Sequence, residues 1–201
     1  MMKSVLISTR PKLVEKIFHK IGEDETGKAI YEKRIEVRKT APQEVPFKCY
    51  IYETKGQYVK FTHGAHTKYG YVRGKVIGEF ICNLVDEYPY DYCDGVDIDD
   101  DTILETAIDR EDINIYAKGK TLYGWHISDL KIYDTLKELS EFNAVCKYIN
   151  EDKSCHFRKV MCPYQQFDYN EDGSINIVEC SRVITRPPQS WMYVEDLGEE
   201  K

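Results

Sequence analysis

The chain has 201 residues, 42% of them hydrophobic and 31% charged, which suits one domain with an elaboration and allows a buried core. No apolar run approaches about 20 residues and no basic start precedes an apolar core, so we expect neither a membrane span nor a signal peptide. Seven cysteines without a CxxC pair then indicate reduced thiols in a cytoplasmic protein.

The net charge of −7 divides unevenly along the chain. Residues 1–75 hold 16 Lys and Arg against 8 Asp and Glu, whereas residues 76–201 hold 12 against 27, so the two parts carry +8 and −15. A basic half is typical of a site for a polyanion, although surface pairs between the halves explain the same imbalance.

In the N-terminal part, residues 5–8 form a short apolar stretch that predicts a first strand. Pro11 suits a first helical turn, and the apolar residues that follow at helical spacing predict a helix ended by Gly22. We expect a flexible loop at residues 22–28, a strand around Ile35 and Val37, and a stronger strand at residues 47–54.

The rest of the chain predicts further strands separated by turns. Gly78 indicates a bulge or a close approach within a long buried strand at residues 75–85. The other segments are a mobile loop at 56–74, an acidic turn-rich segment at 88–101, a helix at 109–116 closed by Gly119, two strands within 121–134, a helical turn at 136–142, an insertion with cysteines at about 144–182, and a last strand at 190–195. We expect a single α+β domain over residues 1–201, with a small β-barrel and flanking helices.

Four cations surround the strand near residue 36, and they are candidate ligand-binding residues. Strand alternation predicts Arg34, Glu36 and Arg38 on one face and Lys33 and Lys39 on the other. In one interpretation Glu36 orients the arginines by ion pairing. In the other, Arg38 holds a phosphate through its planar fork while Glu36 accepts a hydrogen bond from a base amino group.

Aromatic residues in two later strands allow two interpretations as well. Trp125 and His126 belong to one predicted strand and Trp191 to the last one. Large aromatics at such positions usually lie in the core. If exposed beside the cations, each would stack a base and contribute about 1–3 kcal/mol.

Several segments, in order along the chain, resemble ASCH proteins of the PUA-like superfamily, which occur in bacteria and their phages. The segments are SVLISTRPKLVEKI, EKRIEVRK, FKCYIY, GKVIGEF, LYGWHISDLKIYD and TRPPQSWMYVEDL. A Lys shortly before Glu-x-Arg marks the family, and Lys33, Glu36 and Arg38 match it. The resemblance implies a PUA-like β-barrel whose cleft faces RNA, DNA or a nucleotide.

The resemblance also implies possible catalysis, because some members are suggested nucleases and others are amidohydrolases that deacylate modified cytidine. In those amidohydrolases a Lys works with a Thr three residues later, where this chain has Glu36. A carboxylate does not replace an alkoxide nucleophile, which weakens the deacylase hypothesis. The insertion GEDETGKAIY before Lys33 is a second departure.

Two segments contain potential metal ligands, and we expect neither to bind a metal. Cys146, Cys155, Cys162 and Cys180, with His156, fit no standard zinc spacing. The run from Asp168 to Glu179 fits the calcium-loop expression, but flanking prolines and the missing second hand favour a hairpin with an Asp-Gly turn.

Three functions remain open, and no cofactor is expected for any of them. The first is binding of nucleic acid or a nucleotide in a basic cleft. The second is a nuclease or amidohydrolase with Lys33 as base and Glu36 as acid, base or metal ligand. The third is a phage-type accessory protein whose acidic half binds a host protein. No membrane partner is expected, and no P-loop, GxSxG, HExxH or dinucleotide fingerprint is present.

Overall fold

The fold was analysed in a computed structural model of the chain, which describes residues 2–55, 74–145, 165–169, 171, 175–180 and 182–198. Residues 56–73 of the loop expected at 56–74, and most of the insertion expected at about 144–182, therefore lie outside the described residues. Within the described residues, no helix is both long enough and apolar enough to cross a membrane.

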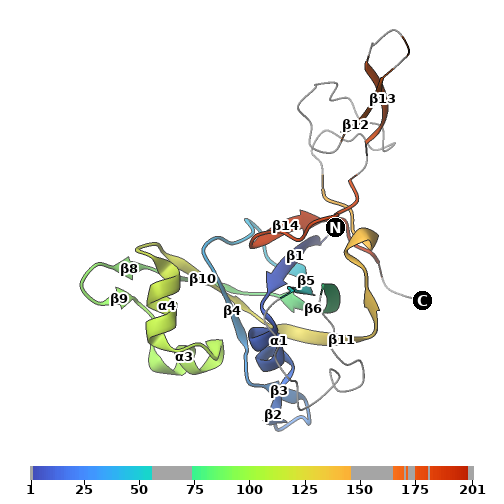
Figure 1. The fold of residues 1–201 in the computed structure, drawn as a ribbon. Coiled ribbons are helices and arrows are strands. Elements are labelled where there is room, and N and C mark those ends of the chain that lie inside the picture. The colour runs from blue at the N-terminus through green and yellow to red at the C-terminus, as the bar shows by residue number, and fades with distance from the viewer. Residues whose placement is uncertain are drawn as a thin grey trace.

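The larger sheet has five strands in the order β11-β6-β5-β1-β14. They are β1 (Lys3–Thr9), β5 (Phe47–Glu53), β6 (Lys75–Cys82), β11 (Ser128–Lys137) and β14 (Trp191–Val194). β1 and β5 run parallel and the other neighbours antiparallel. β5 is buried along its whole length because it is the central strand. The strands expected near residues 5, 47, 75 and 190 are confirmed (Figure 1).

The smaller sheet consists of β4 (Ile35–Arg38), β10 (Leu122–His126) and β7 (Val85–Tyr88), with β10 in the middle. β7 begins shortly after β6 ends, and β11 begins shortly after β10 ends. The paired strands β6·β11 and β7·β10 thus continue from one sheet into the other.

The predicted α+β class is confirmed, but the predicted closed barrel is not formed. β4 is an edge strand of the smaller sheet and β14 an edge strand of the larger one, and among the described residues no ladder joins them. β4 is short, with four residues, and among the described residues it contacts the larger sheet through the Arg38 side chain and not through backbone hydrogen bonds.

Helix α1 (Pro11–Phe18) follows β1 and packs Val14 and Ile17 into the core. It ends earlier than predicted, because β2 (Lys20–Glu23) and β3 (Ala29–Tyr31) form a hairpin where the helix end and a loop were expected. Asp24 fixes the turn of this hairpin, since its Oδ1 accepts hydrogen bonds from the backbone N–H groups of residues 26 and 28.

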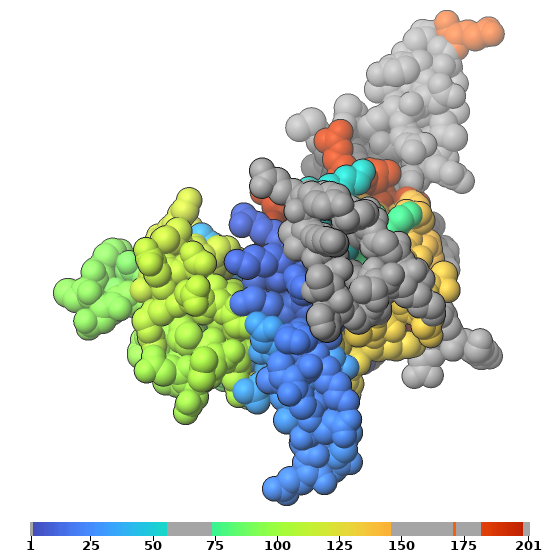
Figure 2. Space-filling model, turned by 60° about the horizontal axis from the view of Figure 1, so that its bottom comes forward, coloured from blue at the N-terminus to red at the C-terminus, as the bar shows by residue number. Residues whose placement is uncertain are grey.

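A lobe formed by residues 89–120 covers the outer face of the smaller sheet (Figures 1 and 2). It contains β8 (Tyr90–Asp91), β9 (Gly95–Val96), α3 (Asp100–Thr106) and α4 (Arg110–Ala117). The α4 prediction is confirmed, whereas α3 arises partly from a segment that was expected to contain only turns. Asp99 begins α3 by accepting a hydrogen bond from the Thr102 N–H at 2.8 Å.

The C-terminal elements agree with the sequence where they are described. A 3-10 turn, η1 (Leu139–Glu141), lies within the predicted helical turn. The predicted hairpin is confirmed by the pairing of β12 (Gln165–Tyr169) with β13 (Ile175–Cys180). Its Asp-Gly turn and Cys146, Cys155 and Cys162 lie outside the described residues.

The main core lies between the two sheets and α1, with Trp125 at its centre. Gly78 is confirmed as a point of close approach, because a Cβ there would lie 2.5 Å from the Lys131 carbonyl oxygen of the neighbouring strand. The two sheets are therefore held together by a continuous apolar layer, against which the residues of β4 are placed.

Candidate functional site: a buried Lys-Glu-Arg cluster on β4

Strand β4 directs Glu36 and Arg38 toward the space between the two sheets. In the register of β4 with β10, Glu36 lies opposite Trp125 and Arg38 opposite Tyr123. Cross-strand partners share a face, so these four side chains point the same way. Glu36 is 3% exposed and Arg38 7%. The predicted common face of Glu36 and Arg38 is therefore observed, but it is buried.

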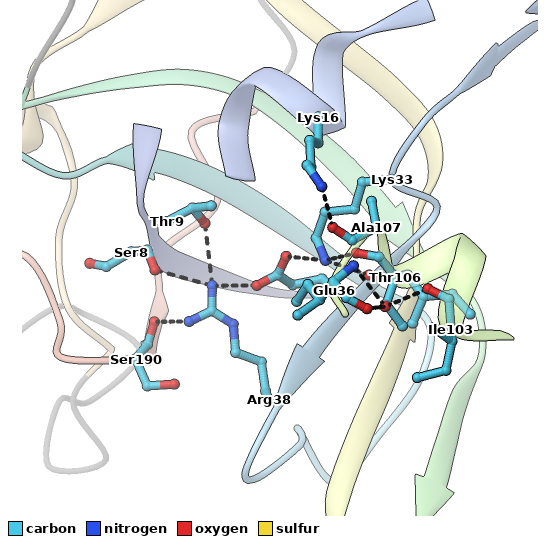
Figure 3. Close-up of polar contacts among 12 residues, drawn as sticks. Ser8, Thr9, Lys16, Lys33, Glu36, Arg38, Ile103, Thr106, Ala107 and Ser190 are labelled. Atoms are coloured by element: carbon cyan, nitrogen blue, oxygen red, sulfur yellow. Dashed lines mark hydrogen bonds and ion pairs between the residues drawn. The ribbon is translucent and has the colours of Figure 1, made fainter. Parts of the chain in front are cut away.

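Lys33 joins this cluster instead of pointing away from it. Its Nζ donates hydrogen bonds to the carbonyl oxygens of Ile35 and Thr106, both at 2.8 Å, and lies 3.5 Å from Glu36 Oε2 (Figure 3). The prediction from strand alternation was wrong for Lys33, because β4 begins only at Ile35. The Lys33 side chain is completely buried.

Arg38 links β4 to the larger sheet. Its Nη2 lies 2.8 Å from Glu36 Oε1 and donates to the Ser8 carbonyl at 3.1 Å and to Thr9 Oγ1 at 3.3 Å. Its Nη1 donates to the Ser190 carbonyl, just before β14, at 3.4 Å. The guanidinium thus links three segments that are distant in sequence, as Figure 3 shows.

The cluster contains more positive than negative charge. Within it Glu36 is the carboxylate that contacts both Lys33 and Arg38. Burial lowers the pKa of the Lys33 ammonium, and the Glu36 carboxylate opposes that effect in part. Arg38 Nε is buried without a hydrogen-bond partner among the described residues. Glu36 Oε2 is likewise buried without a hydrogen-bond partner among the described residues, so one donor and one acceptor of the cluster are left unsatisfied.

Arg34 does not join the cluster, although alternation placed it with Glu36 and Arg38. Its side chain is 48% exposed, and its Nη2 pairs with Glu105 Oε1 of α3 at 3.1 Å. Because Arg34 precedes β4, its direction is set by contacts with α3. It is the one predicted cation of the set Lys33, Arg34 and Arg38 that solvent reaches freely.

The predicted aromatic residues differ in their access to solvent. Trp125 is completely buried and meets Phe47 and Trp191 edge to face, at centroid distances of 5.1 and 5.7 Å. In this arrangement it offers no free face to a base. Trp191 is partly exposed on edge strand β14, and its Nε1 donates to Thr40 Oγ1 at 2.9 Å. Trp191 directly follows Ser190, whose carbonyl accepts a hydrogen bond from Arg38.

His126 points to the opposite face of β10 from Trp125. Its Nε2 lies 2.7 Å from Asp86 Oδ2, and both side chains are partly exposed. Alternation along β10 explains this separation, since neighbouring residues of a strand face opposite sides. His126 is thus not brought together with Lys33, Glu36 and Arg38.

Sequence reasoning missed the groups that hold the two buried cations. They are backbone carbonyls of Ser8, Thr106 and Ser190, and a carbonyl carries no residue-specific signal in a sequence. One signal was available for Thr106. Asp99 followed by Thr102 is an N-cap pattern that predicts a helix ending near residue 106.

Two further cations flank the cluster along the chain. Arg10 follows Thr9 and is exposed, and Lys39 follows Arg38 and is partly exposed. Lys39 Nζ lies 5.0 Å from the ring centroid of Tyr116 in α4. Among the described residues, no group of three or more His, Cys, Asp or Glu side chains is arranged to hold a metal ion.

No protein-family model matches the chain, and no curated protein matches it. Among solved structures the chain is similar to ASCH from Zymomonas mobilis, with a TM-score of 0.44 and 16% identity over 69% of this chain and 78% of that one. A serine-to-alanine variant of that protein gives the same values. A tyrosine-to-phenylalanine variant gives a TM-score of 0.44 and 15% identity over 69% of this chain and 80% of its own.

Proposed function

We propose that this chain is an ASCH-type, PUA-like domain that binds single-stranded nucleic acid or a modified nucleotide along β4. The observation that carries the proposal is the buried cluster in which Lys33 and Arg38 share Glu36. A phosphate or a base carbonyl would supply an acceptor for Arg38 Nε, and a base amino group would supply a donor for Glu36 Oε2. Phosphates are well suited, because arginine and lysine bind them through charge-assisted hydrogen bonds.

Two further features support a nucleic acid as the ligand. Exposed or partly exposed cations occur along this part of the chain, at Arg10, Arg34 and Lys39. Trp191 is partly exposed and directly follows Ser190, whose carbonyl Arg38 contacts. Cations combined with an accessible aromatic ring are typical of proteins that bind single strands, where the ring stacks a base and the cations follow the backbone.

The test is equilibrium binding of fluorescently labelled single-stranded RNA and DNA, followed by anisotropy at several salt concentrations. We expect affinity to fall with salt, since phosphate contacts release counterions. Arg34→Ala should reduce the slope of log K against log salt by about 1. Lys131→Ala is the matched control, because Lys131 is an exposed cation on β11, at the far edge of the larger sheet from β14.

Either of two results would remove the proposal. The first is the absence of binding to any oligonucleotide, nucleotide or nucleoside at low salt. The second is binding that does not change with salt and is equally strong in both variants, because this would exclude phosphate contacts near Arg34.

A hydrolase acting on the same ligands is the second candidate, and the lowered pKa of Lys33 favours it. A lowered pKa brings an amine closer to the deprotonated state that a general base requires. Against it, Lys33 is fully buried and its Nζ is held by two carbonyl groups. Turnover of RNA, DNA or acylated cytidine that disappears in Lys33→Ala would establish the enzyme, and intact substrates under excess protein would exclude it.

The accessory-protein hypothesis depends on the acidic lobe. Asp91, Asp94, Asp97 and Asp101 are exposed there, so the lobe presents a negative surface to a basic partner. Co-purification of a basic protein, with no nucleic acid bound, would favour this third function over binding at β4.

A further inference from the structure

The C-terminal end of α3 is held by basic residues from the N-terminal half of the chain. Lys16 Nζ donates to the Ala107 carbonyl at 2.6 Å, and Lys33 Nζ to the Thr106 carbonyl at 2.8 Å. The Arg34 backbone N–H donates to the Glu105 carbonyl at 2.7 Å, and the Arg34 guanidinium pairs with the Glu105 carboxylate. The last carbonyls of a helix lack partners inside it and form its negative end. Two cations thus contact the carbonyls at the end of this short helix, and a third pairs with its Glu105 carboxylate.

The apolar packing of α3 is partial. Thr106 is its buried residue, Ile103 packs partly buried against the apolar cluster beneath the lobe, and Leu104 is 72% exposed. Ala107, which ends the helix, has a φ of 52°, a left-handed conformation that is strained for alanine. By contrast, α4 anchors the lobe by burying Ile113 and Ala117 against the smaller sheet. Segments with few buried apolar contacts open locally at low cost, so α3 is able to detach while α4 stays docked.

We propose that α3 is a latch that competes with the phosphates of the nucleic acid for Lys16, Lys33 and Arg34. This inference rests on the proposed function, because it assigns a regulation to the same cations. With α3 docked, Lys33 is fully buried and Arg34 is paired (Figure 3 shows the contacts of Lys16 and Lys33). With α3 displaced, phosphate oxygens replace the carbonyl and carboxylate oxygens of residues 105–107. Docking of α3 and full binding of the ligand then exclude each other.

The latch predicts that two substitutions at the C-terminal end of α3, at residues that do not contact the ligand, change its affinity in opposite directions. Ala107→Gly removes the strain of the docked state, so the latch closes more tightly and affinity should fall about threefold. Glu105→Gln removes the ion pair with Arg34, so affinity should rise about threefold. The ligand binds only the state in which α3 is displaced, so its apparent affinity is proportional to the population of that state when the state is rare. A substitution that changes this population therefore changes the apparent affinity by the same factor.

Glu111→Gln is the matched control for the charge change. Glu111 is an exposed carboxylate of α4 in the same lobe, and no described cation pairs with it. Neutralising it should leave affinity nearly unchanged. A Glu111→Gln effect as large as that of Glu105→Gln would mean that general charge, not the latch, sets the affinity.

Hydrogen exchange reports on the latch directly. The Arg34 N–H bonds to Glu105, whereas the Ile127 N–H bonds to the Arg34 carbonyl within the body of the fold, at 2.8 Å. A saturating oligonucleotide should speed exchange at Arg34 and leave Ile127 protected. Slower exchange at Arg34 in the complex would overturn the inference, because α3 would then stay docked while the ligand is bound.

Failure of the latch and failure of the proposed function give different results. Binding by the unmodified chain, with equal affinity in Ala107→Gly and Glu105→Gln, would remove the latch and leave nucleic-acid binding in place. No binding by the unmodified chain or by either variant at low salt would remove the proposed function and the latch with it.

Discussion

At the scale of single residues, Glu36 stabilises two buried cations at once. Its Oε1 lies 2.8 Å from Arg38 Nη2 and its Oε2 3.5 Å from Lys33 Nζ. Other donors of both cations are directed at carbonyl and hydroxyl oxygens, whereas Arg38 Nε has no partner among the described residues. A buried ion pair adds little stability when complete but leaves an expensive charge behind when one partner is removed.

Glu36→Gln should therefore lower the free energy of unfolding by about 3–5 kcal/mol, because it leaves Lys33 and Arg38 without a buried counter-charge. Urea unfolding followed by circular dichroism measures this change. The matched variant is Glu105→Gln, whose partly exposed pair with Arg34 is worth about 1 kcal/mol or less. Equal losses in the two variants would show that the Glu36 carboxylate is not needed to neutralise the cluster.

The pH dependence of stability should report on Lys33. Burial lowers its folded-state pKa below its ordinary value of 10.5. Between the two pKa values the unfolded chain binds more protons, so stability rises with pH over that range. The stability difference between the unmodified chain and Lys33→Met should thus grow as pH increases from neutral toward 10.5. Buried tyrosines are present in both proteins and cancel in this difference.

A flat difference across that range would mean that Lys33 titrates alike in the folded and unfolded chains. Lys131→Met, on an exposed position of β11, is expected to give a flat difference and serves as the control.

At the scale of elements, the packing of β10 requires a glycine at residue 124. Gly124 lies in the central strand of the smaller sheet, and a Cβ there would come within 2.4 Å of Tyr88 Oη. The Tyr88 ring occupies this space and packs in the apolar cluster beneath the lobe. The position of the lobe over β4 is therefore linked to a glycine that the sequence did not single out.

Gly124→Ala should destabilise the protein by about 1–3 kcal/mol, the usual cost of overpacking a core. Gly22→Ala is the matched control, since no atom lies within 4 Å of a Cβ at Gly22 in hairpin β2–β3. Thermal unfolding of both variants tests the difference. If Gly124→Ala melts like Gly22→Ala, Tyr88 moves aside without loss of packing.

At the scale of the whole molecule, side chains join the two sheets where backbone hydrogen bonds do not. Arg38 reaches Ser8 and Ser190, and Trp191 reaches Thr40. The acidic lobe is held against the basic N-terminal half in the same way, through the contacts of Lys16, Lys33 and Arg34 with α3. Some cations of the basic N-terminal half thus contact the acidic lobe inside the fold, whereas Arg10 stays exposed.

Arg38→Lys should cost about 1.5–3 kcal/mol of stability, although the charge is kept. A lysine lacks the planar fork that donates to Ser8, Thr9 and Ser190 from one side chain. Arg34→Lys, at a site with one exposed pair, is expected to change stability by about 0.5 kcal/mol or less. Unfolding of Arg38→Lys at the same denaturant concentration as the unmodified chain would show that the guanidinium does not hold the sheets together.

Local sequence patterns predict the α+β class, most strands, helix α4 and the shared face of Glu36 and Arg38. These follow from local periodicity, which depends only on neighbouring residues. The same patterns do not predict the burial of Lys33, the contacts of Arg38 with the larger sheet, or the position of Trp125 in the core. Those depend on carbonyls and rings from segments far apart in the chain, such as Thr106, Ser190 and Phe47. Only the tertiary structure brings such groups together, because their contacts are set by packing and not by spacing along the sequence.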